Sequence, residues 1–499
     1  MSFNSTPMIH QLRTDFEQLL TLVTGPEAQT ATLNQMERSL FRQVLRLGLK
    51  LLQLFLMTRV AAESHAPQPG ADQTRVPYHS QKSLDYFSIF GKLTYERAYF
   101  YTPGQAGLSP LDAALSLPAR CYSDLLMESA EVLAVDGAYD KSVEVLSRLL
   151  GLSVPKLALE TSVTEHSSLV QAFYAQQAPV PVEDEGPILV VQADGKGVPM
   201  VRRETADLRT GPPRPRAGDM GKVRRGKGDK KTRKKEAIAI AVYTIVPYRR
   251  TPQEVVDALF KKDRPVSDRP APSHKRIFAS LKGKPASLQL LADWAAQRDG
   301  PAIQLRVALT DGAKALQDQL QMKLSHFTLV LDFIHVDEYL WKAGTALYGE
   351  TDPHRAVWVE TQALDLLSSR TAQVIQRLED KAKTLKPRSQ ARRVLQQVAG
   401  YLRRNQAHMD YATYLQRGWP IGTGVIEGVC RHLVKDRLEL SGMRWAKAGA
   451  NALLALRAVN ENGDWDEYHQ FRRTQRHEQL YGVPLDESWL DLAERLEIN

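Results

Sequence analysis

Three carboxylate residues are placed where they could act together on a phosphodiester. Asp194 follows the apolar run GPILVVQA, Asp311 follows IQLRVALT, and Glu427 comes shortly after a Gly-Thr-Gly that opens an otherwise basic helix. Two Mg²⁺ ions about 3.5–4 Å apart can activate an attacking oxygen and stabilise a leaving one. Mg²⁺ prefers oxygen ligands and keeps some of its water, so three acids are enough to hold the ions. The spacing therefore predicts a two-metal site, with Mn²⁺ as the alternative ion.

Each of these acids also has a purely structural interpretation. A strand-end Asp-Gly is often only a turn in which the aspartate caps the next helix. A glutamate in the first turn of a helix complements the helix dipole. The metal interpretation gains weight because all three acids stand in a chain that also carries a basic loop and a basic helix.

The helix that carries Glu427 is expected to position it. Thr423 is a candidate N-cap, which puts Glu427 in the first turn. Arg431 and Lys435 follow at i+4 and i+8 and are expected on the same face, beside the DNA backbone. Val425, Val429 and Leu433 form a separate apolar stripe that would pack on a sheet.

The two aspartates belong to a region in which strand-like and helical patterns alternate. Strand-like runs occur within 186–200, 236–246, 303–320 and 327–344, and the last two lead into helices. Such alternation predicts an α/β core. From about 337 to 415 the pattern is helical throughout, and helices follow in the Glu427 stretch and at 446–460.

The N-terminal part is predicted to be helical and partly β. Residues 8–63 have helical spacing, and their leucines suit either burial in a core or a dimerising coiled coil. A Pro/Gly-rich linker is expected at 62–77, and short strands around a turn at Gly91 within 84–101. Residues 142–167 have the layout of a helix-turn-helix around Gly151, although plain helical hairpins look alike.

The charge of the chain favours an acidic partner. The net charge is +9, and residues 202–235 alone hold 14 Lys/Arg against 4 Asp/Glu. This Gly/Pro-rich stretch is either a solvated loop or a clamp on DNA phosphates ordered by counterion release. Its candidate DNA-binding residues are Arg224, Arg225, Lys230, Lys231, Arg233, Lys234 and Lys235.

Other functional classes find little support. Two cysteines, Cys121 and Cys430, suit a reducing compartment and cannot form a cysteine zinc site. HExxH and GxSxG are absent, which argues against zinc proteases and elbow-type serine hydrolases. No signal peptide is recognisable, and the most apolar run is too short and too charged to span a membrane. We expect a cytoplasmic protein without a membrane partner, associated with the nucleoid when bound to DNA.

Residues 84–460 resemble a bacterial insertion-sequence transposase of the DDE class. The resemblance rests on Asp194-Gly195, Asp311-Gly312, the DxxH from Asp332 to His335, and GTGVIEGVCRHLVKDRLELSGMRW. It is closest to the Kra-type family, which is related to the Mutator-like branch. It implies a ribonuclease H-like (retroviral-integrase-like) core with a helical insertion, and Asp194, Asp311 and Glu427 as ligands of two metal ions. Relatives often carry paired cysteines near the start, and the comparable stretch here, 99–107, has none.

Asp332 is the rival second acid. In the integrase-like sheet the first and fourth strands are neighbours, and Asp311 ends the fourth predicted strand whereas Asp332 ends the fifth. Asp311 is therefore favoured. Asp332 and His335 then support DNA near the cleft, unless they are only a strand-end aspartate and a satisfied histidine. Further candidate contacts to DNA near the scissile bond are Arg437, Arg444 and Trp445, and Trp445 is alternatively a core aromatic.

The predicted architecture has four parts: a helical region at 1–63, a DNA-binding region at 78–180, a catalytic domain at 186–460 and a tail at 461–499. The predicted reaction is metal-dependent cleavage at transposon ends, followed by transfer of the freed 3′-hydroxyl into target DNA. A nuclease or resolvase that never joins strands, and a silent transposase-derived DNA-binding protein, remain open alternatives. Synapsis of two ends predicts a homodimer or larger oligomer. The sequence does not indicate the terminal repeats, the target preference, or a cut-and-paste or copy-out route.

Overall fold

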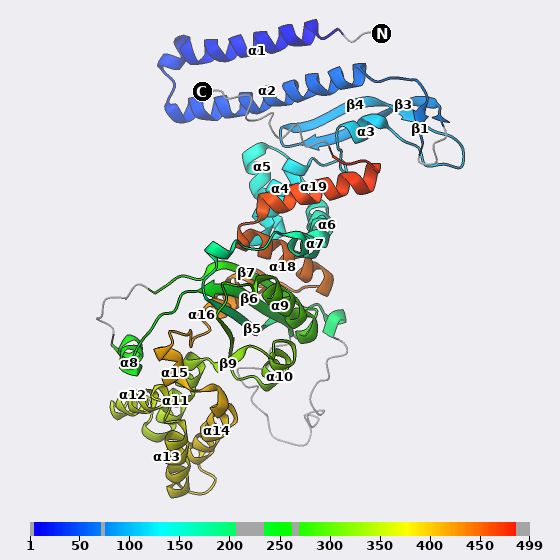
Figure 1. Cartoon of the computed structure of the whole chain (residues 1–499). Coiled ribbons are helices and arrows are strands. Elements are labelled where there is room, and N and C mark those ends of the chain that lie inside the picture. The colour runs from blue at the N-terminus through cyan, green and yellow to red at the C-terminus, as the bar shows by residue number, and fades with distance from the viewer. Residues whose placement is uncertain (1–3, 71–74, 206–233, 262–268, 486–499) are drawn as a thin grey trace, which may run out of the picture. The chain divides into compact units, whose positions relative to one another are not determined.

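The computed structural model describes residues 4–70, 75–205, 234–261 and 269–485 (Figure 1). The chain divides into two units: Met1–Leu169 with Trp465–Asn499, and Val170–Asp464. The described C-terminal residues, 465–485, therefore group with the N-terminal region. Within the described residues, no helix has both the length and the apolar character needed to cross a membrane.

The first unit begins with two helices, α1 (Thr6–Thr24) and α2 (Leu33–Ala61). Gly25 ends α1, and Thr32 starts α2 with a capping box, in which Thr32 and Gln35 exchange hydrogen bonds. Apolar residues of α2 remain exposed on one stripe, so burial in a core does not account for them. This α2 stripe consists of Phe41, Val44, Leu51 and Phe55, each 47–55% exposed.

The predicted strands around Gly91 form a hairpin. β3 (Tyr78–Ser88) pairs antiparallel with β4 (Gly91–Phe100), and Ser88 lies opposite Gly91. Gly91 has a φ of 140°, which is accessible to glycine because it has no Cβ. One face of the hairpin packs on α2 through Leu93, Tyr95 and Leu56. A short two-stranded pair, β1 (Gln68–Pro69) and β2 (Arg75–Val76), precedes the hairpin.

Helices complete the first unit. The hairpin predicted around Gly151 is present, since Gly151 ends its first helix with a φ of 70°. The helices are α3 (Pro110–Ala114), α4 (Asp124–Asp136), α5 (Tyr139–Leu150), α6 (Lys156–His166) and α19 (Trp465–Tyr481).

The second unit is built on a mixed five-stranded sheet, which confirms the predicted α/β class. Its strand order is β7-β6-β5-β8-β9. β5 pairs antiparallel with β6, and β6 with β7, whereas β8 runs parallel to both β5 and β9. The strands are β5 (Ile188–Pro199), β6 (Lys234–Ile245), β7 (Ser273–Ser280), β8 (Leu305–Thr310) and β9 (Thr328–Leu331).

Helices connect and cover these strands. α9 packs on β5 and β6, and α18 packs on β7 (Figure 1). One group of helices in this unit lies outside the segment between β9 and α16. These helices are α7 (Val170–Gln176), α8 (Pro252–Phe260), α9 (Lys284–Arg298), α10 (Lys314–Lys323), α16 (Gly424–Val429), α17 (Asp436–Leu438) and α18 (Lys447–Asn462).

The predicted all-helical segment lies between β9 and α16. Its helices are α11 (Phe333–Tyr348), α12 (His354–Leu367), α13 (Thr371–Thr384), α14 (Gln390–Asn405) and α15 (Tyr411–Gln416). They share one apolar core with the sheet, in which Val190 and Leu309 of the strands join Leu366 and Leu395 of the helices. The apolar core of the helical segment is therefore continuous with that of the sheet.

Candidate metal centre

Two of the predicted acids lie at the same level of neighbouring parallel strands. The pairing of β5 with β8 ends at Gln192 and Leu309, two residues before Asp194 and Asp311. Asp311 directly follows β8, as predicted, but Asp194 does not end its strand, because β5 runs on to Pro199 beside β6. Only the pairing of β5 with β8 ends before Asp194. The edge of β5 that faces β8 is therefore open at Asp194.

Asp332 joins this edge from the next strand. It directly follows β9, and its backbone N–H donates to the Thr310 carbonyl at 2.8 Å. The hydroxyl of Tyr401, on α14, donates to the Asp311 carbonyl at 2.9 Å and so connects the helical segment with the end of β8. The carboxyl ends of parallel strands are where open α/β sheets hold their ligands.

Gln192 fixes the start of the Glu427 helix over the sheet. Its buried side chain accepts a hydrogen bond from the Ile426 N–H at 2.9 Å and donates to the Tyr243 hydroxyl at 2.9 Å. The sequence analysis missed this residue. An uncharged amide in the otherwise apolar run ILVVQAD was the available signal.

Cys430 brings the same helix against Asp194. Its thiol donates to Asp194 Oδ2 at 3.4 Å, and Cys430 follows Glu427 by one helical turn. Burial, and next the Asp194 carboxylate, raise the pKa of the Cys430 thiol, so the thiol stays protonated at neutral pH. Asp194 and Glu427, more than 200 residues apart in sequence, therefore face the same region.

Asp332 is a fully buried carboxylate with both oxygens occupied. Oδ1 accepts from the N–H groups of Ile334 and Thr423, at 3.1 and 3.2 Å. Oδ2 accepts from the His335 N–H at 3.3 Å, from His335 Nδ1 at 2.6 Å and from the Thr423 hydroxyl at 2.8 Å. A carboxylate offers about four lone-pair sites. Asp332 is thus saturated by protein donors and connects the ends of β9, α11 and α16.

Thr423 stands at the N-cap position, but its side chain makes no capping bond, contrary to prediction. Its hydroxyl lies 2.8 Å from Asp332 Oδ2 and 3.1 Å from Glu427 Oε1. A hydroxyl has one hydrogen to donate, so it serves only one of the two carboxylates fully. Thr423 therefore positions Glu427 relative to Asp332 while leaving negative charge in excess.

Potential metal-binding atoms of Asp332, His335 and Glu427 lie within 4.8 Å of one another. The hydrogen bond that His335 donates to Asp332 raises the pKa of His335 to about 9, even though burial opposes it, and Asp311 contributes through its charge. His335 is therefore cationic at neutral pH and compensates Asp332. The predicted DxxH residues form a pair, and Glu427 is the exposed member of the group.

Asp194, Asp311 and Glu427 differ from Asp332 in what surrounds them. None of the three forms an ion pair with a lysine, arginine or histidine among the described residues. Asp311 uses only Oδ1, which accepts from the Ala313 N–H at 2.8 Å, and Glu427 uses only Oε1 within the same described part. Both oxygens of Asp194 accept hydrogen bonds, from the Gly195 N–H at 2.6 Å and from the Cys430 thiol at 3.4 Å. Asp311 and Glu427 each keep an unused oxygen, which fits a hard divalent cation.

The helix that carries Glu427 widens directly after α16. Cys430–Lys435 form a π-helical turn, which α17 follows. Arg457, buried on α18, donates to the carbonyls of Leu433 at 2.9 Å and His432 at 2.6 Å within this turn. π-helical turns are rare in proteins overall, and those that occur are often at functional sites. The wider turn changes the helical register from Cys430 onward.

The predicted DNA contacts around this helix separate into two groups. Arg431, Lys435 and Arg444 are exposed. Arg437 is fully buried, and Trp445 is 8% exposed. The Trp445 indole N–H donates to the Leu438 carbonyl at 3.0 Å, and the Arg437 guanidinium lies 5.1 Å from its ring centroid. Arg437 and Trp445 are therefore core residues here, and Trp445 offers no open ring face on which a base could stack.

Most of the predicted basic clamp lies outside the described residues: Arg224, Arg225, Lys230, Lys231 and Arg233. Lys234 and Lys235 begin β6. Lys234 pairs with Glu439, and Lys235 lies 4.0 Å from Glu204. These two lysines are thus partly neutralised by acids of the same unit.

The second helix of the predicted helix-turn-helix, α6, carries little positive charge on its surface. Its Lys156 pairs with Asp140 at 3.3 Å, and its Glu165 pairs with Arg120. Leu157 is 72% exposed. Such a surface does not favour contact with phosphates.

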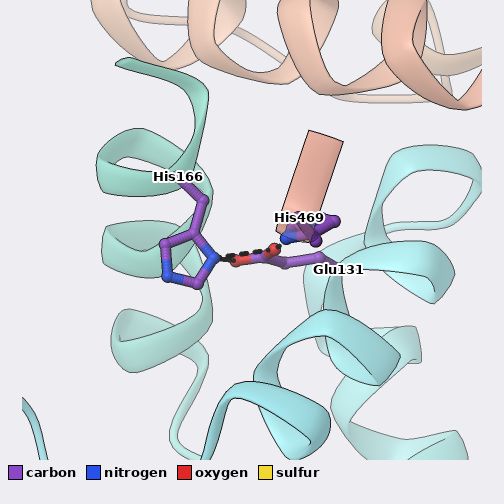
Figure 2. A group of neighbouring side chains, drawn as sticks. All are labelled: Glu131, His166 and His469. Atoms are coloured by element: carbon purple, nitrogen blue, oxygen red, sulfur yellow. Dashed lines mark hydrogen bonds and ion pairs between the residues drawn. The ribbon is translucent and has the colours of Figure 1, made fainter. Parts of the chain in front are cut away.

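A second group of potential ligands lies in the first unit: Glu131, His166 and His469 (Figure 2). His166 Nδ1 lies 2.9 Å from Glu131 Oε1, and His469 Nε2 lies 3.9 Å from Glu131 Oε2. Glu131 is fully buried, and His469 is 1% exposed. Burial lowers the pKa of His469 to about 3, so this ring is neutral at pH 7.

Arg472 determines where the protons of this group lie. Its guanidinium is 3.0 Å from His166 Nε2 and 3.2 Å from His469 Nδ1. Arginine only donates, so both of these nitrogens accept, and the nitrogens that face Glu131 carry hydrogen. A metal needs a lone pair on those nitrogens. The group is therefore a hydrogen-bond network that joins α4, α6 and α19.

Of the two groups, only the one at the sheet edge has carboxylate oxygens free to bind a cation among the described residues. Comparison of the chain with models of known protein families and with curated protein sequences finds no match in either case.

Proposed function

We propose that the chain is a DDE transposase of the Kra-type insertion-sequence family, related to the Mutator-like branch. It cleaves DNA at transposon ends and transfers the freed 3′-hydroxyl into target DNA. The observation that carries the proposal is the placement of Asp194 and Asp311 level on adjacent strands, with the Glu427 helix held against Asp194 through Cys430. None of the three acids forms an ion pair with a cationic side chain in the described structure.

The strand arrangement supports a ribonuclease H-like core. Such a fold requires the first and fourth strands to be neighbours, and β5 and β8 are the first and fourth strands of this sheet. The first three strands are antiparallel, the last two run parallel to the first, and the helical segment lies between the fifth strand and the Glu427 helix. Asp194 and Asp311 are then level on adjacent strands.

Asp311 is the better second ligand. Asp332 already accepts five hydrogen bonds, and binding an ion would require some of them to break. Asp311 has an unused oxygen and receives one backbone hydrogen bond. Asp332 and His335 then act as positioning residues, because Thr423 connects Asp332 with Glu427.

Mg²⁺ or Mn²⁺, two ions per site, would be held by Asp194, Asp311 and Glu427. When bound, such ions activate the attacking oxygen and stabilise the leaving oxygen of an in-line displacement. The protein's own part is to keep three carboxylates on rigid strands and a helix that several buried hydrogen bonds fix. Cleavage and strand transfer are both displacements at phosphorus, so one site serves both.

Transposon-end DNA and target DNA are the proposed partners. Arg431, Lys435 and Arg444 are exposed on and after the helix that carries Glu427 and suit phosphate contacts. The α2 stripe supports a homodimer or larger oligomer, since exposed apolar stripes on long helices commonly pair. A synaptic complex needs two transposon ends held together, and pairing of two chains would provide this.

The test is cleavage of DNA that carries the element's own ends, with Mg²⁺ or Mn²⁺, by the wild type and by Glu427→Gln. Loss of cleavage with DNA binding retained supports the proposal, and unchanged cleavage refutes the role of Glu427. Pre-cleaved ends with a 3′-hydroxyl separate a transposase from a nuclease or resolvase, which would not join them. Tight binding without cleavage by either protein would indicate a silent DNA-binding descendant.

A further inference from the structure

A pocket of about 980 Å³ lies beside the metal-binding group. Its walls come from the end of β6 and the residues after it, from α8, and from residues 418–425 that lead into α16. Phe333, Ile334, Gly422 and Gly424 line it, and they are chain neighbours of Asp332, His335 and Thr423. One end of the pocket therefore adjoins the carboxylates.

The pocket combines flat rings with positive charge. Tyr248 and Trp419 supply rings, and Arg249, Arg250 and Arg269 supply guanidinium groups. The guanidinium of Arg250 lies 5.1 Å from the centroid of the Tyr248 ring. The lining also holds Lys261, which pairs with Asp257 at 2.7 Å, and Glu254, whose carboxylate caps α8. Among the described residues of the lining, positive charge is in excess.

Two buried polar groups of the lining lack a hydrogen-bond partner in the described structure. They are the indole N–H of Trp419, a residue only 5% exposed, and the Nε–H of Arg250. Burial, and next the charge of Arg269, lower the pKa of Arg250. Like charges drawn together, with unused donors beside them, are typical of a site that receives an anion.

We propose that this pocket holds one unpaired nucleotide of the DNA strand processed at the neighbouring carboxylates. Its base lies against Tyr248 and the edge of Trp419, and its phosphate meets Arg249, Arg250 and Arg269. Stacking on rings and guanidinium planes, with cations along the backbone, is how proteins bind single strands. The volume suits a small ligand and excludes a duplex. The inference rests on the proposed function and specifies how a DNA end is held.

The probe is a DNA duplex with a single-stranded overhang that contains 2-aminopurine, compared with the same duplex made blunt. Binding by the full chain is followed by anisotropy, and stacking by quenching of 2-aminopurine. The test variants are Arg249→Ala/Arg269→Ala, at two exposed arginines, and Tyr248→Leu. The control, Lys381→Ala/Arg393→Ala, removes the same charge from exposed positions on α13 and α14.

We expect the wild type and the control to bind the overhang DNA more tightly than the blunt DNA and to quench the fluorophore. The arginine pair should lose this preference by about tenfold or more. Tyr248→Leu should lose it by roughly five- to 100-fold, together with the quenching. Equal affinity of the wild type for both DNAs would overturn the proposal that the pocket binds a nucleotide, and the proposed function would be unaffected. Failure to bind either DNA overturns both.

Discussion

Asp332 and Thr423 connect the end of β9 to the start of α16 by two hydrogen bonds. The Thr423 N–H donates to Oδ1 at 3.2 Å, and its hydroxyl donates to Oδ2 at 2.8 Å. Both residues are buried, and 91 residues separate them in sequence. This connection closes the helical segment onto the sheet and fixes where Glu427 emerges.

Thr423→Val should weaken this closure while preserving side-chain shape. The buried Asp332 oxygen would lose a donor, which costs about 1–3 kcal/mol in unfolding free energy. Thr423→Ser keeps the hydroxyl and should lie close to the wild type. Denaturant unfolding of both variants measures the difference, and a loss in Thr423→Ser without a loss in Thr423→Val would show that the methyl group, not the hydroxyl, matters.

Asp311→Asn and Asp332→Asn should fail in different ways. Asp311→Asn should leave the melting temperature nearly unchanged and reduce metal-dependent cleavage by more than the ~10–100-fold typical of an outer-shell partner. Asp332→Asn should lower the melting temperature, because its amide nitrogen would face donors such as His335 Nδ1. Cleavage assays and thermal unfolding on the same preparations decide the question. The opposite pattern would make Asp332 the second ligand.

From the raised pKa of His335 we expect the free energy of unfolding to fall at alkaline pH. Its pKa is raised to about 9, chiefly by the hydrogen bond that it donates to Asp332, against about 6.5 when unfolded. The stabilisation is therefore complete below pH 6.5 and disappears as the pH rises through about 9. Midpoints of urea unfolding should fall across this range and should be flatter in His335→Gln. A slope that survives this substitution would have another origin.

From the lowered pKa of His469 we expect the free energy of unfolding to fall at acidic pH. Burial lowers its pKa to about 3, so between pH 6.5 and 3 the unfolded chain binds a proton that the folded chain does not. Stability should decline across that interval. His469→Gln, which keeps one donor and one acceptor, should flatten the decline, whereas the exposed His354→Gln should not.

The α2 stripe predicts a change of assembly state. Leu51→Glu places a charge among Phe41, Val44 and Phe55 and should shift the chain toward the monomer in analytical ultracentrifugation. Gln53→Glu changes charge at an exposed polar position of the same helix and is the control. A monomeric wild type would exclude this stripe as the interface.

The sequence predicted helices and strands better than it predicted contacts between residues far apart in the chain. The strands beside Asp194 and Asp311 and the helical segment followed from runs and spacing, because apolar periodicity is local information. Gln192 was missed, and Thr423 was taken for a cap, because their partners lie 234 and 91 residues away. Trp445 illustrates the same limit. Its backbone N–H donates to the Pro199 carbonyl at 3.0 Å, a pairing that no local pattern contains.

The π-helical turn has a consequence for how the protein is made. The carbonyls of His432 and Leu433 in this turn accept hydrogen bonds from Arg457, which lies on the next long helix, α18. During synthesis the chain emerges from its N-terminus, so Asp194 and Asp311 leave the ribosome long before Arg457 does. The nascent chain therefore holds all three carboxylates before it can fix the third. The surroundings of Glu427 are therefore complete only after α18 has been translated and has docked.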